Sequence, residues 1–139
     1  MTTKRIRQLA ESLAVRDRNV GQTLVKIRES FDALRRRAEL SVEAFRSTVC
    51  ELGAEHLSHV AIGPVEPDEK HVDCLQFKVQ RGRWEIVCVA KPRGTVVFVG
   101  PYRAGKPERP CQEHLLPSPE ADAGLDDLLL DLLCEACRL

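Results

Sequence analysis

The first half of the chain carries apolar residues at alternating spacings of three and four. The pattern spans residues 20–52, and this spacing places the side chains on one face of an α-helix. Gly53 follows the last of them, where a residue in the left-handed conformation commonly ends a helix. The apolar positions are Val20, Leu24, Ile27, Phe31, Leu34, Ala38, Val42, Phe45, Val49 and Leu52.

Three further apolar residues extend the same face toward the N-terminus: Ile6, Leu9 and Leu13. Between the two groups, Asn19 and Gly21 are poor helix formers. The sequence therefore predicts a helical segment over residues 1–53, either as one helix with a weak point near Gly21 or as two helices.

The next part of the chain, residues 54–104, has the character of β-strands. Residues 72–79 alternate between two faces, and the segments 84–91 and 95–102 are apolar on both faces and are joined by a turn with Pro and Gly. With residues 56–63 they predict four antiparallel strands in an up-and-down meander. Strands that are apolar on both faces are covered on both sides, so we expect the chain's own helices to cover one face and another surface to cover much of the other.

The C-terminal part reads as a linker followed by a helix. Prolines and glycines exclude long regular structure over residues 105–124. Leucines at helical spacing then predict an amphipathic helix over residues 125–139 that packs on the sheet. The expected fold class is α+β, with a long N-terminal coiled-coil-like helix, a four-stranded antiparallel sheet and a C-terminal helix.

The length of the first helix indicates self-association. A helix over residues 20–52 is roughly 50 Å long, whereas a strand of eight residues spans only about 27 Å. The sheet cannot cover the whole stripe, and a second copy of the chain is the simplest source of another helix. We assign dimerisation to Leu24, Ile27, Phe31, Leu34 and Phe45. Two alternatives stay open: packing of the bulky Phe31 and Phe45 against the sheet, and a helix that folds back near Gly21.

Composition narrows the class of protein without naming a function. Apolar residues make up 43% of the chain and charged residues 30%, which is ordinary for a globular protein. No apolar run is long enough for a membrane span and no secretory signal is recognisable, so we expect a cytoplasmic protein with reduced cysteines.

The charges lie in blocks although the net charge is zero. Residues 1–46 and 78–109 are basic, whereas residues 47–77 and 110–139 are acidic. Such blocks favour docking within the chain or contacts between subunits, and the alternative is that each block is simply a solvated face.

Two pairs of residues have the spacing of zinc ligands. Cys111 and His114 form one pair and Cys134 and Cys137 the other, and together they could make a tetrahedral site. The alternative is that these residues only pack. A redox role for Cys134 and Cys137 is disfavoured, because a thiolate at a helix C-terminus beside carboxylates is unstable.

Three consecutive arginines, Arg35, Arg36 and Arg37, are candidates for binding a nucleic-acid backbone. Acidic residues alternate with the basic ones around them, as on a solvated helix with salt bridges. His56 and His59 with Glu55 could suggest a metal or a general base, but no third ligand is evident, and no catalytic motif is present.

These patterns favour a non-enzymatic homo-oligomer that binds another protein, as an adaptor or an assembly protein. A nucleic-acid-binding regulator that uses the Arg-rich helix is the alternative. A small interaction domain stabilised by zinc is the third possibility.

Overall fold

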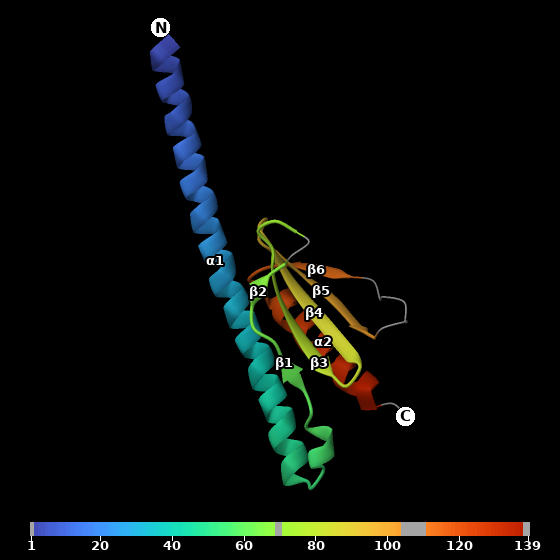
Figure 1. The fold of residues 1–139 in the computed structure, drawn as a ribbon. Helices are drawn as coiled ribbons and strands as arrows, with labels where there is room; N and C mark the ends of the chain where they lie inside the picture. The colour runs from blue at the N-terminus through green and yellow to red at the C-terminus, as the bar shows by residue number, and fades with distance from the viewer. Residues whose placement is uncertain (1, 69–70, 104–110, 138–139) are drawn as a thin grey trace.

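A computed structural model describes residues 2–68, 71–103 and 111–137. The fold is α+β, as the sequence predicts: a long N-terminal helix, an antiparallel sheet and a C-terminal helix (Figure 1). In chain order the elements are α1 (Thr2–Glu51), the 3-10 helix η1 (Glu55–Leu57), β1 (Ala61–Ile62), β2 (Glu66–Pro67), β3 (Leu75–Arg81), β4 (Trp84–Lys91), β5 (Thr95–Tyr102), β6 (Gln112–Leu115) and α2 (Pro119–Cys137).

Helix α1 is one uninterrupted helix, which resolves the alternative of a break at Gly21. It ends as the sequence predicts, because Gly53 adopts a positive φ of 75°. The amide of Gly53 donates to the Cys50 carbonyl and the amide of Ala54 donates to the Val49 carbonyl. These two hydrogen bonds form a Schellman motif, which satisfies carbonyls that the end of the helix would leave unpaired.

The sheet has the strand order β1-β3-β4-β5-β6, with β2 also paired to β3, and all pairings are antiparallel. Strands β4 and β5 have the bounds that their apolar patterns predict. The first predicted strand is reduced to the two residues of β1, because η1 takes up part of its sequence. Strand β6 lies inside the predicted linker and was not anticipated, since its pairing with β5 uses backbone hydrogen bonds and needs no apolar pattern.

Helix α2 begins at Pro119, earlier than the predicted start at residue 125. The side chain of Ser118 accepts a hydrogen bond of 3.0 Å from the amide of Ala121. A serine N-cap followed by proline in the first helical position is a favoured start for a helix. The sequence pattern predicts a linker here, whereas Pro119 in fact begins the helix.

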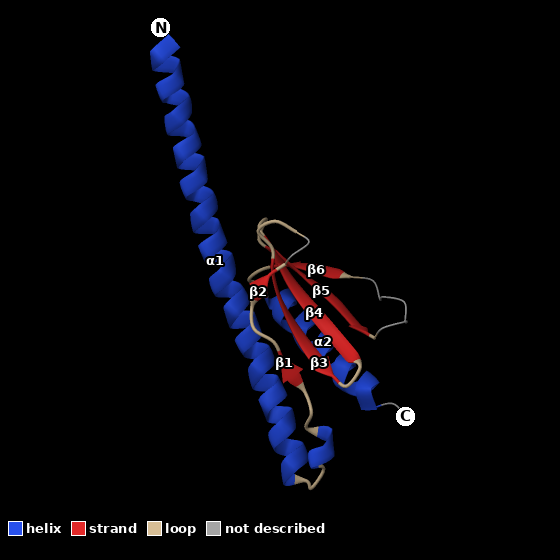
Figure 2. Cartoon of the chain, in the orientation of Figure 1, coloured by secondary structure: helices blue, strands red, loops and turns tan. Residues whose placement is uncertain are grey.

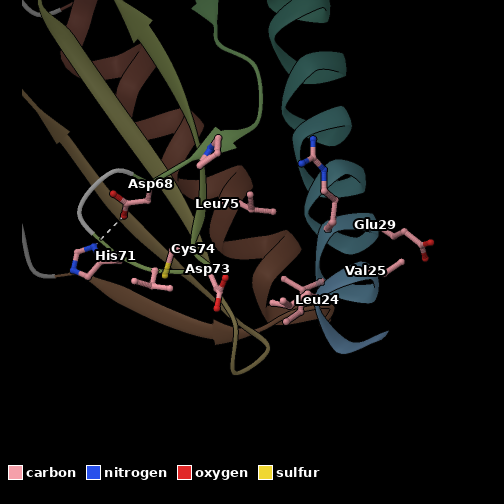
Figure 3. A pocket seen from close by; sticks show the side chains of 12 residues that line it. Leu24, Val25, Glu29, Asp68, His71, Asp73, Cys74 and Leu75 are labelled. Carbon is pink, nitrogen blue, oxygen red and sulfur yellow. Dashed lines mark hydrogen bonds and ion pairs between the residues drawn. The ribbon is translucent and has the colours of Figure 1, made fainter. Parts of the chain in front are cut away.

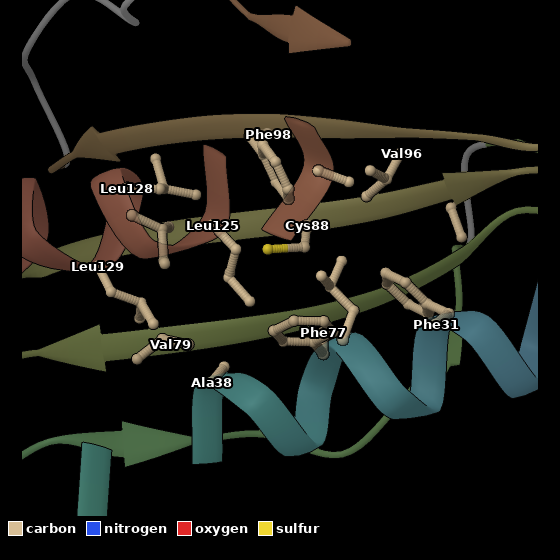
Figure 4. Packing of buried hydrophobic residues seen from close by; sticks show 14 of the residues in the cluster. Phe31, Ala38, Phe77, Val79, Cys88, Val96, Phe98, Leu125, Leu128 and Leu129 are labelled. Atoms are coloured by element: carbon tan, nitrogen blue, oxygen red, sulfur yellow. The ribbon is translucent and has the colours of Figure 1, made fainter. Parts of the chain in front are cut away.

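Both helices contribute to the core on one face of the sheet (Figures 2 and 4). The Phe31 ring of α1 lies 5.1 Å from the Phe77 ring of β3, measured between centroids. Leu125 and Leu132 of α2 are fully buried in the same cluster. The opposite face of β4 and β5, which points away from the helices, carries four valines: Val87, Val89, Val97 and Val99. Of these four only Val87 is buried.

One buried charge connects the sheet to the three helical elements. Arg81 of β3 donates hydrogen bonds to the carbonyls of Leu133 in α2, at 2.9 Å, and of Leu57 in η1, at 3.3 Å. Its guanidinium carbon lies 5.1 Å from the centroid of the Phe45 ring of α1. Arg81 is only 7% exposed, so these contacts replace its hydration.

Candidate functional site: an uncovered helix face and the groove at its base

Helix α1 has one apolar face that is buried along half of its length and uncovered along the other half. Ile27, Phe31 and Leu34 are at most 6% exposed. The apolar residues upstream are exposed by half or more: Ile6 62%, Leu9 59%, Leu13 51% and Val20 50%. At about 100° per residue, all these side chains fall within an arc of about 80° around the helix axis. The face that enters the core is therefore the same face that is left uncovered, and its four upstream residues are called the free stripe below.

The free stripe lies on a helical rod that projects past the sheet (Figure 1). Residues 2–23 of this rod are roughly 33 Å long at about 1.5 Å per residue. Every residue from Thr3 to Thr23 is exposed. This half of α1 therefore lacks the tertiary packing that supplies most of the stability of protein helices.

Charges are unevenly placed along the rod. Lys4, Arg5 and Arg7 lie near its N-terminal end, where residues 2–10 contain no acidic side chain. Arg16 stands on the apolar face itself, between Leu13 and Val20 in sequence, and it is exposed. Residues 19–25 carry no charge.

A groove opens where the rod meets the sheet, between α1 and the segment that connects β2 to β3 (Figure 3). Its volume is about 730 Å³. Leu24 and Ile27 line it from α1, and Leu75 lines it from β3. The connecting segment adds Pro67, Val72 and Cys74 and the polar residues Asp68, His71 and Asp73. We call this the base groove: its wall is mainly apolar, and two carboxylates lie on the side of the connecting segment.

The polar side of the base groove holds a carboxylate–imidazole contact and a protonated thiol. Asp68 and His71 contact each other, with 3.0 Å between Oδ2 and Nδ1. Burial raises the pKa of the Cys74 thiol, and the charge of Asp68 acts in the same direction. The thiol is therefore protonated at neutral pH and contributes to the wall as a small apolar group.

The residues assigned to dimerisation from the sequence are largely occupied by contacts within the chain. Ile27, Phe31 and Leu34 are core residues, and Phe45 packs against the core and under Arg81. Leu24 is half-buried in the wall of the base groove. The alternative in which the two phenylalanines pack near the sheet agrees with this placement, and the surface left for a partner helix lies further toward the N-terminus.

The three arginines do not form a free basic patch. Arg37 pairs with Asp126 of α2 through two hydrogen bonds of 3.0 and 2.7 Å, and this pair raises the pKa of the arginine. Arg35 donates to the Gly63 carbonyl at 2.7 Å and also contacts Glu39. Only Arg36 has no such contact among those that the structure records, so two of the three guanidinium groups hold the fold together.

Two of the four predicted zinc ligands, His114 and Cys134, lie far apart. His114 packs against α2 at Gly124, where an added Cβ would lie 3.1 Å from its Nε2. Cys134 is ten residues further along the helix, or about 15 Å, much more than the roughly 2 Å of a zinc–ligand bond. Cys111 is exposed, and the side chain of Cys137 lies outside the described residues. In the described part of the chain no group of three or more His, Cys, Asp or Glu could hold a metal ion, and this includes the exposed His56 and His59.

A second apolar groove, between α1 and α2, lies on the compact part of the molecule. Its volume is about 710 Å³, and Phe45 and Leu133 form part of its wall. Two leucines at this groove are largely exposed, Leu40 by 67% and Leu130 by 59%. This helix–helix groove is larger than the neighbouring groove lined by Phe98 and Leu128, which has a volume of about 540 Å³.

Opposite charge blocks meet within the chain. Arg37 of the first basic block contacts Asp126 of the last acidic block, and Lys91 and Arg93 of the second basic block contact Glu113. The charge pattern thus serves docking within the chain at these two places.

Among the described residues, no helix has both the length and the apolar character needed to cross a membrane. Comparison of the chain with protein-family models, with curated protein sequences and with solved structures found no match.

Proposed function

We propose that this protein is a non-enzymatic adaptor or assembly protein that dimerises through the free half of α1 and binds another protein with its compact head. The head is the sheet together with α2 and the buried half of α1. The observation that carries the proposal is the free stripe, in which four apolar side chains are exposed by 50–62% on the half of α1 that no other described part of the chain covers.

Physical chemistry favours a partner for this half of the helix. Most of the stability of protein helices comes from packing of an amphipathic face, and the free half of α1 has no such packing. A second copy of the chain supplies a helix with the same stripe, and a two-fold interface lets both copies bury it at once.

The energetic scale agrees with a reversible dimer. Full burial of a Val, Leu or Ile side chain contributes about 1.5–3 kcal/mol, so covering the exposed half contributes about 1 kcal/mol for each residue. Four residues in each of two copies then contribute about 8 kcal/mol. Association costs about 4–15 kcal/mol in lost freedom, so we expect dimerisation that depends on protein concentration.

The head supports the second half of the proposal. The helix–helix groove presents Leu40 and Leu130, which are exposed by more than half, beside the Arg37–Asp126 ion pair. An apolar groove with charges at its edge has the composition typical of a protein-binding surface.

Leu13→Glu and Val15→Glu provide a matched test of dimerisation. Both native side chains are 51% exposed, but residues two positions apart lie about 160° apart around a helix, so only Leu13 belongs to the free stripe. Leu13→Glu is present in both copies of a dimer. A loss of about 1.5 kcal/mol of association free energy in each copy weakens association by roughly 100-fold.

The measurement is native mass spectrometry over a dilution series. We expect the native protein and Val15→Glu to dimerise alike and Leu13→Glu to be monomeric at the same concentrations. A native protein that stays monomeric at high concentration, or equal dimerisation of both variants, would contradict the proposal.

A nucleic-acid-binding regulator is less well supported. Two of its three arginines, Arg35 and Arg37, already donate hydrogen bonds to groups within the chain. Binding a phosphate backbone through them would require breaking those contacts.

A further inference from the structure

The proposed dimer can be parallel or antiparallel, and the charges on α1 distinguish the two. Arg16 lies on the apolar face between Leu13 and Val20. In a parallel dimer each residue of the face lies beside the same residue of the partner, so the two Arg16 side chains would meet in one layer. Like charges at such a position are unfavourable, and a polar residue in a helical seam commonly sets the orientation of the pair.

The basic end of the rod supports the same choice. A parallel dimer would bring Lys4, Arg5 and Arg7 next to the same three residues of the partner. An antiparallel dimer instead places Arg5 and Arg7 beside the uncharged residues 19–25, and only Lys4 comes near a like charge, Lys26 of the partner subunit. The base groove of the partner then lies at this end, with the carboxylates of Asp68 and Asp73 on its connecting segment.

The base groove also offers apolar surface where an antiparallel helix would end. Leu24 and Ile27 continue the free stripe into the wall of the groove, and Leu75 points from β3 toward the helix (Figure 3). A helix lying along the stripe of its partner would therefore meet an apolar wall at its N-terminal end.

We infer that two copies of this chain pair as an antiparallel dimer, in which residues 2–13 of each copy lie along residues 16–27 of the other and enter its base groove. This inference rests on the proposed self-association. In this register Leu13 faces Arg16 of the partner subunit, and Leu9 faces Val20 of the partner subunit. The two Arg16 side chains are offset by three residues, about 4.5 Å, along the axis instead of sharing one layer. The basic N-terminal end of each copy lies near the acidic edge of the partner's groove.

Two native lysines report the orientation without any engineered label. Within one chain, Lys4 and Lys26 lie about 33 Å apart along the straight helix. In the antiparallel dimer Lys4 of one copy lies beside Lys26 of the partner subunit. In a parallel dimer Lys4 would lie beside Lys4 of the partner subunit.

The test is cross-linking of the full-length protein with a short amine-reactive reagent, followed by mass spectrometry of the dimer and monomer bands. Mixing ¹⁵N-labelled and unlabelled chains identifies links between subunits. We expect a Lys4–Lys26 link between differently labelled chains, found in the dimer band alone. Lys26→Arg is the matched control, because it keeps the charge and removes the reactive amine, and the link should then be lost while the dimer persists.

The outcomes separate the orientation from the dimer itself. A dimer with Lys4–Lys4 links and no Lys4–Lys26 link is parallel and overturns the inference, but it leaves the proposed self-association intact. A dimer with neither link associates through another surface and also overturns it. A protein that is monomeric by native mass spectrometry removes the proposed dimer and the orientation together.

Discussion

Replacing Arg81 tests whether one buried charge holds the head together. The proposed substitution is Arg81→Met, which keeps most of the side-chain length and removes the guanidinium. The native side chain donates to the carbonyls of Leu133 and Leu57 and stacks on Phe45. After the substitution both carbonyls lose a donor in a part-buried site.

The magnitude follows from these contacts. A hydrogen bond from a charged donor contributes about 1.5–3 kcal/mol, and a cation–π contact about 0.5–2 kcal/mol. The native state also bears the cost of removing the charge from water, which offsets part of this sum. We therefore expect Arg81→Met to lower the free energy of unfolding by about 3 kcal/mol. With a slope of about 2 kcal/mol per molar urea, the midpoint moves down by about 1.5 M.

The assay is urea unfolding followed by circular dichroism, with Arg83→Met as the control. Arg83 lies two residues away in the β3–β4 turn and is exposed, and exposed substitutions of this kind change stability by less than about 0.5 kcal/mol. A loss of less than about 1 kcal/mol for Arg81→Met, close to that of the control, would refute the reasoning.

Three further predictions concern α2, α1 and the edge of the sheet. Gly124→Ala should destabilise the fold by about 1 kcal/mol in urea unfolding, because overpacking costs about 1–3 kcal/mol and outweighs the helix propensity of about 1 kcal/mol that alanine gains; its Cβ would lie 2.9 Å from Cε2 of Phe98. If Gly124→Ala instead stabilised the fold, α2 would pack less closely than described. In contrast, Gly21→Ala has no atom within 4 Å of the new Cβ, and we expect it to raise the helix content measured by circular dichroism. Folding lowers the pKa of Glu113, chiefly through its hydrogen bond from Thr95, so its contribution to stability is present at neutral pH and lost as acid protonates it. Glu113→Gln should therefore reduce stability at neutral pH and have no effect at a pH where the carboxyl is protonated in both states; an equal loss at both pH values would assign the effect to packing.

The elements with a repeated pattern could be predicted from the sequence. Strands β4 and β5 are marked by long apolar runs and by a glycine at the turn between them, and α1 is marked by its spacing of three and four. Strand β6 has no such mark, because an edge strand gains its hydrogen bonds from the backbone of its neighbour. Arg81 could have been noticed, since it continues the inward alternation of Phe77 and Val79 as a charged residue.

The candidate site was less predictable because a periodic pattern identifies a face and not what covers it. Leu34 and Leu13 occupy equivalent positions on that face, yet one is 3% and the other 51% exposed. The difference depends on where the sheet lies along the helix, which is a long-range contact. The Arg37–Asp126 pair joins residues 89 positions apart, and no local spacing indicates it. The sequence therefore identifies the apolar face of α1, but not which part of that face the sheet covers.

Because α1 is continuous, it fixes both the distance and the direction of the free stripe relative to the head. A flexible linker of the same 22 residues would span a broad range of distances around roughly 26 Å, whereas the helix holds one distance and one direction for each side chain. A single residue inserted near Gly21 would turn the free stripe by about 100° relative to the head, and an inserted heptad would restore its direction to within about 20°. A partner bound to the free stripe would therefore lie at a fixed angle to the head, and an insertion of one heptad would nearly preserve this angle whereas an insertion of one residue would not.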